Sequence, residues 1–448
     1  MRSDRIALRP WSLALLASVG LVAVYLILTP AAGDLAAATY RSDLFARVGF
    51  STWDTGWYAA HGYWLPAYSL LSPALGALLG VRALLALSAL AASALFAQIA
   101  ERVFAPAAAR AAASVFALGI CVGMLSGRVP YYLGFAIGLG SVLASLQGRT
   151  ALALTLAVLT SAASPVAGAF LALAALAWAA TSERESRHGL TLAAAAVAPI
   201  LLLSLAYPNG GYEPFAASAF WPALAGVTLI ALLLPRGPLT VHERLVVRIG
   251  AALYALALIA AYAINTPMGG NAARLGPLLA APLITGVLWE RHRLALLLLA
   301  APLLYWQLVT PIRDYASLAS DPSVNASYYA PLRSELRRLD RGQPTIVEVP
   351  LTKAHWESAY LAGHEGVKLA RGWERQLDTR YGAIFYKKTL SANAYHTWLH
   401  ENRVRYVALP DAPLDRAGTR EGALIAAGMP YLRELWHSKH WRIYRFVG

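Results

Sequence analysis

The sequence predicts an α-helical polytopic membrane bundle of eleven to twelve helices, followed by a C-terminal extracytoplasmic domain of the α/β or α+β class. First, the 448 residues are 58% hydrophobic and 14% charged, with a mean hydropathy of +0.50, whereas soluble domains are near 25% charged. Second, the charges are uneven, because residues 311–448 contain 20 of the 38 Lys and Arg and 14 of the 24 Asp and Glu residues. Third, every long apolar run lies before residue 311.

Twelve apolar runs are the candidate helices, and a spanning helix needs about 20 residues. They lie at residues 12–30, 68–80, 83–99, 111–126, 130–147, 150–163, 165–181, 189–207, 219–234, 247–265, 275–289 and 294–310. Arginine-rich connections are expected in the cytoplasm. These are residues 1–9, 101–110, 149, 182–188, 236–248 and 290–293, so the weakly charged turns 207–218 and 265–276 are expected outside.

An inside N-terminus and an outside C-terminal domain require an odd number of crossings, so one run does not span. The run 68–80 is short and contains Pro73 and two glycines, which is typical of a re-entrant or interfacial segment. Eleven crossings follow, and the alternative is that this run spans and another short run does not. A signal peptide is the rival interpretation of the first run, but the topology favours a retained helix.

The predicted domains are a transmembrane domain at 1–310, a linker at 311–324 and a soluble domain at 325–448, in a bacterial plasma membrane. Residues 31–66 form a first extracytoplasmic loop with interfacial helices. In the soluble domain, the patterns predict helices at 328–339 and 392–402 and strands at 345–349, 404–409 and 441–446. The net charge of +14 does not predict nucleic-acid binding, because most arginines of the membrane part lie in its short connections. Cys121 is the single cysteine, which excludes a disulfide framework.

The first extracytoplasmic loop is rich in aromatic residues that recur at helical spacing. Trp53, Trp57, Trp64 and Tyr68 show this spacing, and Trp and Tyr prefer the headgroup level of the bilayer. One interpretation is therefore an amphipathic helix that lies in the membrane interface.

The same loop also contains ionisable residues that could act in catalysis. Asp54, Tyr58 and His61 are spaced by four and three residues, so a helix would place them on one face. A carboxylate beside an imidazole can act as a base and its orienting partner, and the group could also bind a metal ion. Asp43 follows the first crossing closely.

The layout of one crossing, a long external loop with an early aspartate, many crossings and an external domain resembles the GT-C glycosyltransferases. These membrane enzymes use polyprenyl-phosphate-linked sugars as donors. The stretch Trp-Asp-x-x-Trp-Tyr at 53–58 is similar to a loop motif of some membrane mannosyltransferases, and residues 57–73 resemble actinobacterial integral membrane proteins. The resemblance implies that Asp43 or Asp54 is the general base or helps to bind a divalent cation. The chain departs from the family in lacking a clear Asp-x-Asp or Glu-x-Asp pair.

Two arginines are expected on the outer side, against the usual orientation rule. Arg128 follows Ser126-Gly127, and Arg274 follows the segment that contains Gly269, Gly270 and Asn271. The guanidinium fork suits phosphate oxygens, so Arg128, Asn271 and Arg274 are candidates for a donor phosphate site. Snorkelling to lipid phosphate and a simple glycine turn are the alternatives.

The soluble domain has one stretch in which an aromatic residue alternates with charges. Arg371, Trp373 and Glu374 lie close together there, and such a set suits sugar binding. With Trp57 they are candidates for the acceptor site. The alternative is an ion-paired helix that packs on the bundle.

The predicted function is therefore a membrane glycosyltransferase, a hexosyl- or pentosyltransferase, that acts on an envelope glycan or glycolipid at the outer face. Asp43 or Asp54 would take the acceptor proton, with His61 or Tyr58 orienting it. Ionisable residues within the apolar runs are nearly absent, which disfavours an ion-coupled transporter. A lipid flippase and a non-catalytic envelope-assembly protein remain as rival hypotheses.

Overall fold

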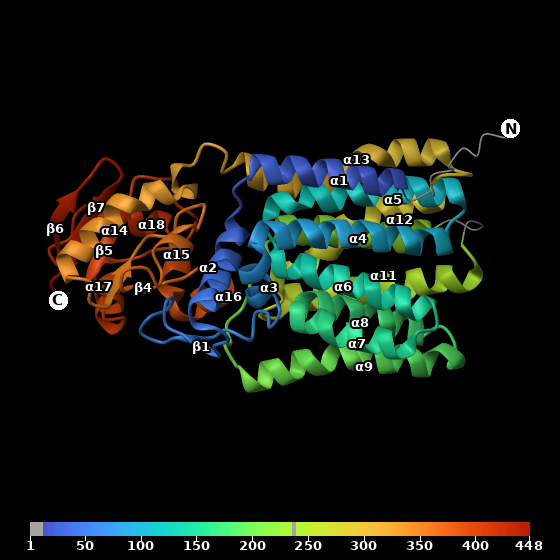
Figure 1. Ribbon diagram of the computed structural model, residues 1–448, viewed down its shortest axis with the longest axis horizontal. Coiled ribbons are helices and arrows are strands. Elements are labelled where there is room, and N and C mark those ends of the chain that lie inside the picture. The colour runs from blue at the N-terminus through green and yellow to red at the C-terminus, as the bar shows by residue number, and fades with distance from the viewer. Residues whose placement is uncertain (1–11, 235–238) are drawn as a thin grey trace.

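A computed structural model describes residues 12–234 and 239–448 of the chain. The basic segment 1–9 and the first residues of the connection 236–248 fall outside the described residues. Figure 1 shows a bundle of roughly parallel helices with a second domain at one end of the long axis.

The bundle has one helix for each predicted apolar run except 68–80. Its helices are α1 (Ser12–Leu28), α4 (Val81–Val103), α5 (Pro106–Gly123), α6 (Val129–Leu146), α7 (Thr150–Ala163), α8 (Pro165–Ala179), α9 (Glu183–Ala206), α10 (Ala217–Leu233), α11 (Val241–Ala263), α12 (Leu275–Leu288) and α13 (Arg293–Ala316). Short 3-10 turns, η1 (Met124–Ser126) and η2 (Gly269–Arg274), precede α6 and α12. Seven of the described helices have the length and apolar composition of a membrane span, so this is a multi-pass membrane protein. The number of eleven crossings stays a prediction, because α7, α8 and α10 are shorter.

The run 68–80 does not form a spanning helix. It contains α3 (Ser72–Leu79), which has 8 residues and is therefore about 12 Å long at 1.5 Å per residue. A bilayer core is about 30 Å thick, so the prediction that this run does not cross is confirmed.

The segment after α1 bends sharply. α2 (Gly33–Val48) is inclined by 76° to α1, and in Figure 1 it stands across the end of the bundle, beside the second domain. This helix lies within the predicted loop 31–66, where an interfacial helix was expected.

The predicted helix over residues 53–68 is wrong. The structure has a small antiparallel pair instead, β1 (Trp53–Asp54) with β2 (Tyr63–Trp64). The aromatic residues pack around this pair rather than along a helix: Trp53 lies against Trp64 with ring centroids 4.6 Å apart. Asp54, Tyr58 and His61 therefore do not share a helix face.

The C-terminal domain is a five-stranded mixed sheet with helices around it. Its elements are η3 (Pro322–Val324), α14 (Ala326–Asp340), β3 (Thr345–Glu348), α15 (Glu357–Tyr360), β4 (Val367–Leu369), α16 (Arg375–Tyr381), η4 (Ala383–Tyr386), α17 (Ala392–Glu401), β5 (Tyr406–Pro410), α18 (Thr419–Ala426), β6 (Leu432–His437) and β7 (Trp441–Phe446). The strand order is β4-β3-β5-β7-β6. Strands β4, β3 and β5 are parallel, and β7 is antiparallel to both of its neighbours, β5 and β6. The α/β or α+β prediction is confirmed, and α13 continues to Ala316, six residues into the predicted linker.

The first loop joins the bundle to the C-terminal domain. Backbone bonds connect the segment after β1 to the end of β4: Ala59 donates to the Leu369 carbonyl at 3.0 Å, and Leu369 donates to Gly56 at 2.9 Å. The buried Trp57 indole donates to the carbonyl of Ser358 at 2.8 Å. A side chain at Gly372 would collide with Trp57, whose Cβ is 2.6 Å from the position of such a Cβ. Trp57 is therefore a docking residue between the first loop and the C-terminal domain.

Candidate active site

A cavity of about 660 Å³ lies where the bundle meets the C-terminal domain. Its walls come from α2, the start of α6, the α7–α8 turn, the end of α9, and the loops that follow α9 and α11. Residues 373–376 of the C-terminal domain complete it. This volume is in the range of pockets that hold small ligands.

Asp34 in the first turn of α2 lies between the two predicted arginines. Arg128 Nε is 3.2 Å from Asp34 Oδ2, and Arg274 Nη2 is 4.0 Å from the same oxygen. Arg128 Nη2 is also 3.9 Å from Asp314 Oδ2, which accepts a hydrogen bond from Ser126 at 3.0 Å. The positive end of α2 adds to the stabilisation of the Asp34 carboxylate. The two arginines, far apart in sequence, therefore converge on one side of the cavity.

Gly127 is what allows this approach. Its φ is +72°, a conformation that favours glycine, and a Cβ there would lie 2.8 Å from both the Ala32 Cβ and the Leu35 nitrogen. The turn between α5 and α6 can thus press against the start of α2. That contact sets Arg128 beside Asp34.

Glu213, in the loop between α9 and α10, lines the cavity as well. Its backbone nitrogen donates to the Thr266 carbonyl at 3.0 Å. Burial raises the pKa of its carboxyl group to about 7, an effect that Arg375 and Arg274 oppose. The turn 207–218, expected to be a weakly charged external connection, thus supplies an ionisable group to the site.

The wall from the C-terminal domain is held by a buried ion pair. Glu374 pairs with Arg41 of α2, and both side chains are almost fully buried. The Arg41 guanidinium also lies 3.8 Å from the ring centroid of Tyr68, a cation–π contact. Burial raises the pKa of the Glu374 carboxyl group, and Arg41 opposes that shift.

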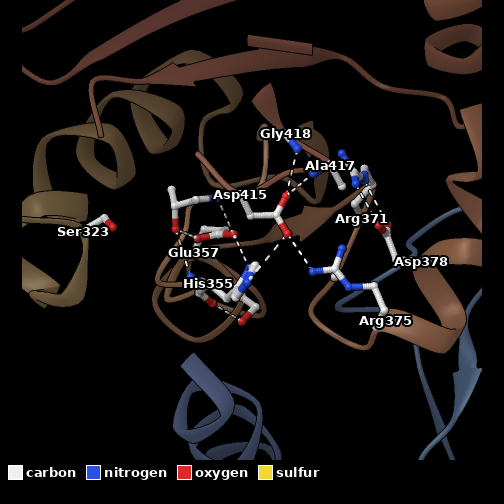
Figure 2. A network of polar contacts seen from close by, with 12 residues as sticks. Ser323, His355, Glu357, Arg371, Arg375, Asp378, Asp415, Ala417 and Gly418 are labelled. Atoms are coloured by element: carbon white, nitrogen blue, oxygen red, sulfur yellow. Dashed lines mark hydrogen bonds and ion pairs between the residues drawn. The ribbon is translucent and has the colours of Figure 1, made fainter. Parts of the chain in front are cut away.

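Arg375 of this wall is held by a polar network that Figure 2 shows. The His355 imidazole stacks on Trp373 with a centroid distance of 3.4 Å. Asp415 Oδ2 accepts from Arg375 at 2.8 Å and lies 3.8 Å from His355 Nε2. The N–H groups of Ala417 and Gly418 bind the other Asp415 oxygen. Burial lowers the pKa of His355 to about 4, so this imidazole is neutral at pH 7.

All three predicted donor-site residues line the cavity: Arg128, Asn271 and Arg274. Of the predicted acceptor residues, Trp373 and Glu374 line it as well. Trp57 is fully buried in the docking contact. Arg371 lies within the C-terminal domain, where it forms two hydrogen bonds to Asp378, at 3.0 and 2.8 Å, and one to Glu421 at 2.9 Å.

The four predicted catalytic residues do not line the cavity. Asp43 is exposed near Arg47. Asp54 is buried, and its two oxygens accept from the Tyr40 hydroxyl at 2.8 Å and the Gly56 nitrogen at 3.0 Å. Tyr58 donates to the carbonyls of Gly372 and Glu374, which are 3.0 and 3.1 Å away. His61 is exposed and stacks on Tyr381 with centroids 4.6 Å apart.

Besides Glu374, the carboxylates that line the cavity are Asp34 and Glu213, and neither of these two was predicted from the sequence. The available signal for Asp34 is its position just after the first apolar run, residues 12–30. Glu213 is the one acidic residue of the turn 207–218.

The implied divalent cation does not fit the residues suggested for it. Both oxygens of Asp54 already accept hydrogen bonds from the protein, and Asp43 lies beside Arg47. Within residues 12–234 and 239–448, no group of three or more His, Cys, Asp or Glu residues is arranged to hold a metal ion.

The fold and the cavity define a class of protein: a multi-pass helical bundle that carries a C-terminal domain over a cavity. In particular, the chain is similar to the crystal structure of the Archaeoglobus fulgidus oligosaccharyltransferase tethered with an acceptor peptide containing the NVT sequon. That match has a TM-score of 0.52 and 12% identity and covers 91% of this chain and 69% of the other. A further match is the archaeal oligosaccharyltransferase AglB from Archaeoglobus fulgidus in complex with an inhibitory peptide and a dolichol-phosphate, with a TM-score of 0.45, 13% identity, and the same shares of 91% and 69%.

No protein-family model matches the sequence, and no curated protein matches it. At 12% identity the structural likeness establishes the fold, and the predicted GT-C-like architecture is confirmed. The chemistry has to come from the residues of the cavity.

Proposed function

We propose that this chain is a membrane glycosyltransferase that moves a sugar from a polyprenyl-phosphate-linked donor to an acceptor hydroxyl. It would act at the outer face of a bacterial plasma membrane, on an envelope glycan or glycolipid, with the N-terminus in the cytoplasm. The observation that carries the proposal is the convergence of Arg128 and Arg274 on one wall of a cavity of about 660 Å³.

Two guanidinium groups suit a leaving phosphate. As the bond between the sugar and the phosphate breaks, negative charge grows on the phosphate oxygen, and preorganised cations stabilise that charge. Arg128 and Arg274 are both held near Asp34, so they are in place before the donor binds. Asn271 lines the same wall and offers an amide for a further hydrogen bond.

The acceptor would enter from the side of the C-terminal domain. Residues 373–376 form this wall, with an indole, a carboxylate, a guanidinium and an amide. Such a set of groups can bind hydroxyl-rich molecules. The structural relative is an oligosaccharyltransferase whose crystal structure holds a tethered acceptor peptide, which supports a transferase with an acceptor site here.

The buried polar residues of the bundle disfavour the transporter hypothesis. In the described part of the bundle helices, the fully buried polar side chains are those of serines, threonines and Gln307. Ion- and proton-coupled transporters use ionisable residues at that depth. The charged groups here lie at the cavity instead.

The test is a transfer assay with purified protein in lipid nanodiscs, polyprenyl-phosphate mannose, glucose and arabinose as donors, and octyl glycosides as acceptors. We expect transfer from at least one donor, and we expect Arg128→Gln and Arg274→Gln each to lower it at least tenfold. The matched control is Arg149→Gln, which changes an exposed arginine in the α6–α7 turn. Equal transfer by all three variants, or none by the unmodified protein, would contradict the proposal.

A further inference from the structure

Glu213 has a fixed backbone and an unengaged carboxylate. Gly269, with φ +39°, lets the loop after α11 approach so closely that any Cβ there would overlap the Glu213 carbonyl. The bond from the Glu213 nitrogen to Thr266 holds the same contact. Among the described residues, no hydrogen bond or ion pair to its side-chain oxygens is formed. The carboxylate is therefore placed at the cavity wall by the backbone and is free to take a proton.

Two other carboxylates line the cavity, and both are engaged. One is Glu374, which pairs with Arg41, and the second is Asp34. It pairs with Arg128 at 3.2 Å and lies 4.0 Å from Arg274. Asp34 therefore serves to orient the two arginines, while the unengaged Glu213 carboxylate is available to accept a proton. Two carboxyl groups in unlike environments are a common arrangement for dividing such roles.

The four charges around Glu213 come from three parts of the molecule. Arg375 and Glu374 belong to the C-terminal domain, Arg274 to η2 and Asp34 to α2. Burial and the two carboxylates raise the Glu213 pKa, the two arginines lower it, and the result is about 7. A base with a pKa near the working pH combines a useful ionised fraction with a useful proton affinity.

We propose that Glu213 is the catalytic general base of the transfer, an inference that rests on the proposed function. The acceptor oxygen forms a bond to the anomeric carbon of the donor sugar while the bond from that carbon to the phosphate oxygen breaks. The bonding pair leaves with polyprenyl phosphate, whose charge meets Arg128 and Arg274. The acceptor proton passes to a Glu213 oxygen and later returns to water. The acceptor class is accordingly a neutral hydroxyl group, which needs a base.

The test compares Glu213→Gln and Glu213→Asp with the unmodified protein, using the donor and acceptor that are active in the transfer assay. In the unmodified protein, kcat/KM should rise with pH through a midpoint near 7, because the ionised carboxylate is the active form. Glu213→Gln should lower kcat by about 10²- to 10⁴-fold and lose that rise, with binding of polyprenyl phosphate changed less than twofold. Glu213→Asp should keep part of the activity and its acid limb. Glu290→Gln, an exposed carboxylate at the far turn before α13, is the matched control.

The outcomes separate the two proposals. Sugar transfer by a folded Glu213→Gln protein at the normal kcat and with the same acid limb overturns the role of Glu213 and leaves the glycosyltransferase standing. Absence of transfer by the unmodified protein overturns the proposed function and this inference with it. A loss of polyprenyl phosphate binding in Glu213→Gln, at unchanged thermal stability, also overturns the inference, because a base is not required for donor binding.

Discussion

Among single residues, Arg128 and Arg274 bind anions differently from lysines. A guanidinium is planar and offers a fork of donors, whereas an ammonium group is one compact charge. Arg128 uses its Nε for Asp34, 3.2 Å away, and has Nη2 3.9 Å from Asp314. Its orientation is therefore set by two carboxylates on two elements.

Replacement of Arg128 should show this difference. Arg128→Gln should lower the affinity for polyprenyl phosphate by about 10- to 150-fold, the equivalent of about 1.5–3 kcal/mol for a hydrogen bond to a charged group. Arg128→Lys should recover only part of it. Binding isotherms in nanodiscs measure the change, and full recovery by lysine would contradict the forked contact.

The pair of Arg41 and Glu374 makes a stability prediction. Both are almost fully buried, and removing one partner leaves an unpaired buried charge at a cost of about 3–5 kcal/mol. Arg41→Met should therefore destabilise the protein strongly. The double variant Arg41→Met with Glu374→Met should be close to the unmodified protein, because an apolar pair can replace a buried ion pair. Thermal unfolding measures both, and a double variant as unstable as the single one would refute the explanation.

At the scale of elements, the turn between α5 and α6 fixes the geometry of the site. Gly127→Ala would introduce a strained φ and a methyl group that collides with Ala32 and Leu35. Gly148, in the α6–α7 turn, has nearly the same φ of +73° but no atom within 4 Å of an added Cβ.

We therefore expect Gly127→Ala to lose polyprenyl phosphate affinity, because α2 and Asp34 must move away from Arg128. It should also lose about 2–4 kcal/mol of stability, from the strain and the overlap together. Gly148→Ala should lose about 1–2 kcal/mol from strain alone and keep its affinity. Equal affinities in the two variants would show that this turn does not position the site.

The elements differ in how well the sequence predicted them. The bundle helices followed from apolar length, and β7 (Trp441–Phe446) has the bounds expected of it, because both signals are local. The helix expected around Trp57 and Tyr58 was wrong because their spacing reflects docking on Gly372 and Ser358, some three hundred residues away. No local pattern contains that contact.

Only part of the site was predicted, because several of its contacts join residues that are distant in the sequence. Arg128 and Arg274 were predicted from the sequence because an arginine expected on the outer side contradicts the usual charge bias. The role of Glu213 could not be predicted from the sequence, because its surroundings are formed by Gly269 and the C-terminal domain, which are distant in the chain. Asp34 acquires its place from Arg128 and Arg274, both of which are distant in sequence.

At the scale of the whole molecule, the proposed chemistry requires the cavity and the C-terminal domain to face away from the cytoplasm. The domain lies at one end of the bundle (Figure 1). Lys439 is exposed in that domain and Arg291 is exposed in the turn before α13. These two positions report on opposite predicted sides of the membrane.

Labelling of intact cells tests the orientation. In a Cys121→Ala background, which removes the only cysteine, Lys439→Cys should react with a membrane-impermeant maleimide. Arg291→Cys should react only after the cells are opened. The reverse pattern would place the cavity in the cytoplasm and contradict the proposed donor side.

A cryo-EM structure of the protein in nanodiscs with polyprenyl phosphate would show whether the cavity binds the phosphate of a polyprenyl donor. We expect phosphate density within hydrogen-bonding distance of Arg128 and Arg274. Phosphate bound elsewhere, with the two arginines still paired only with Asp34, would contradict this expectation.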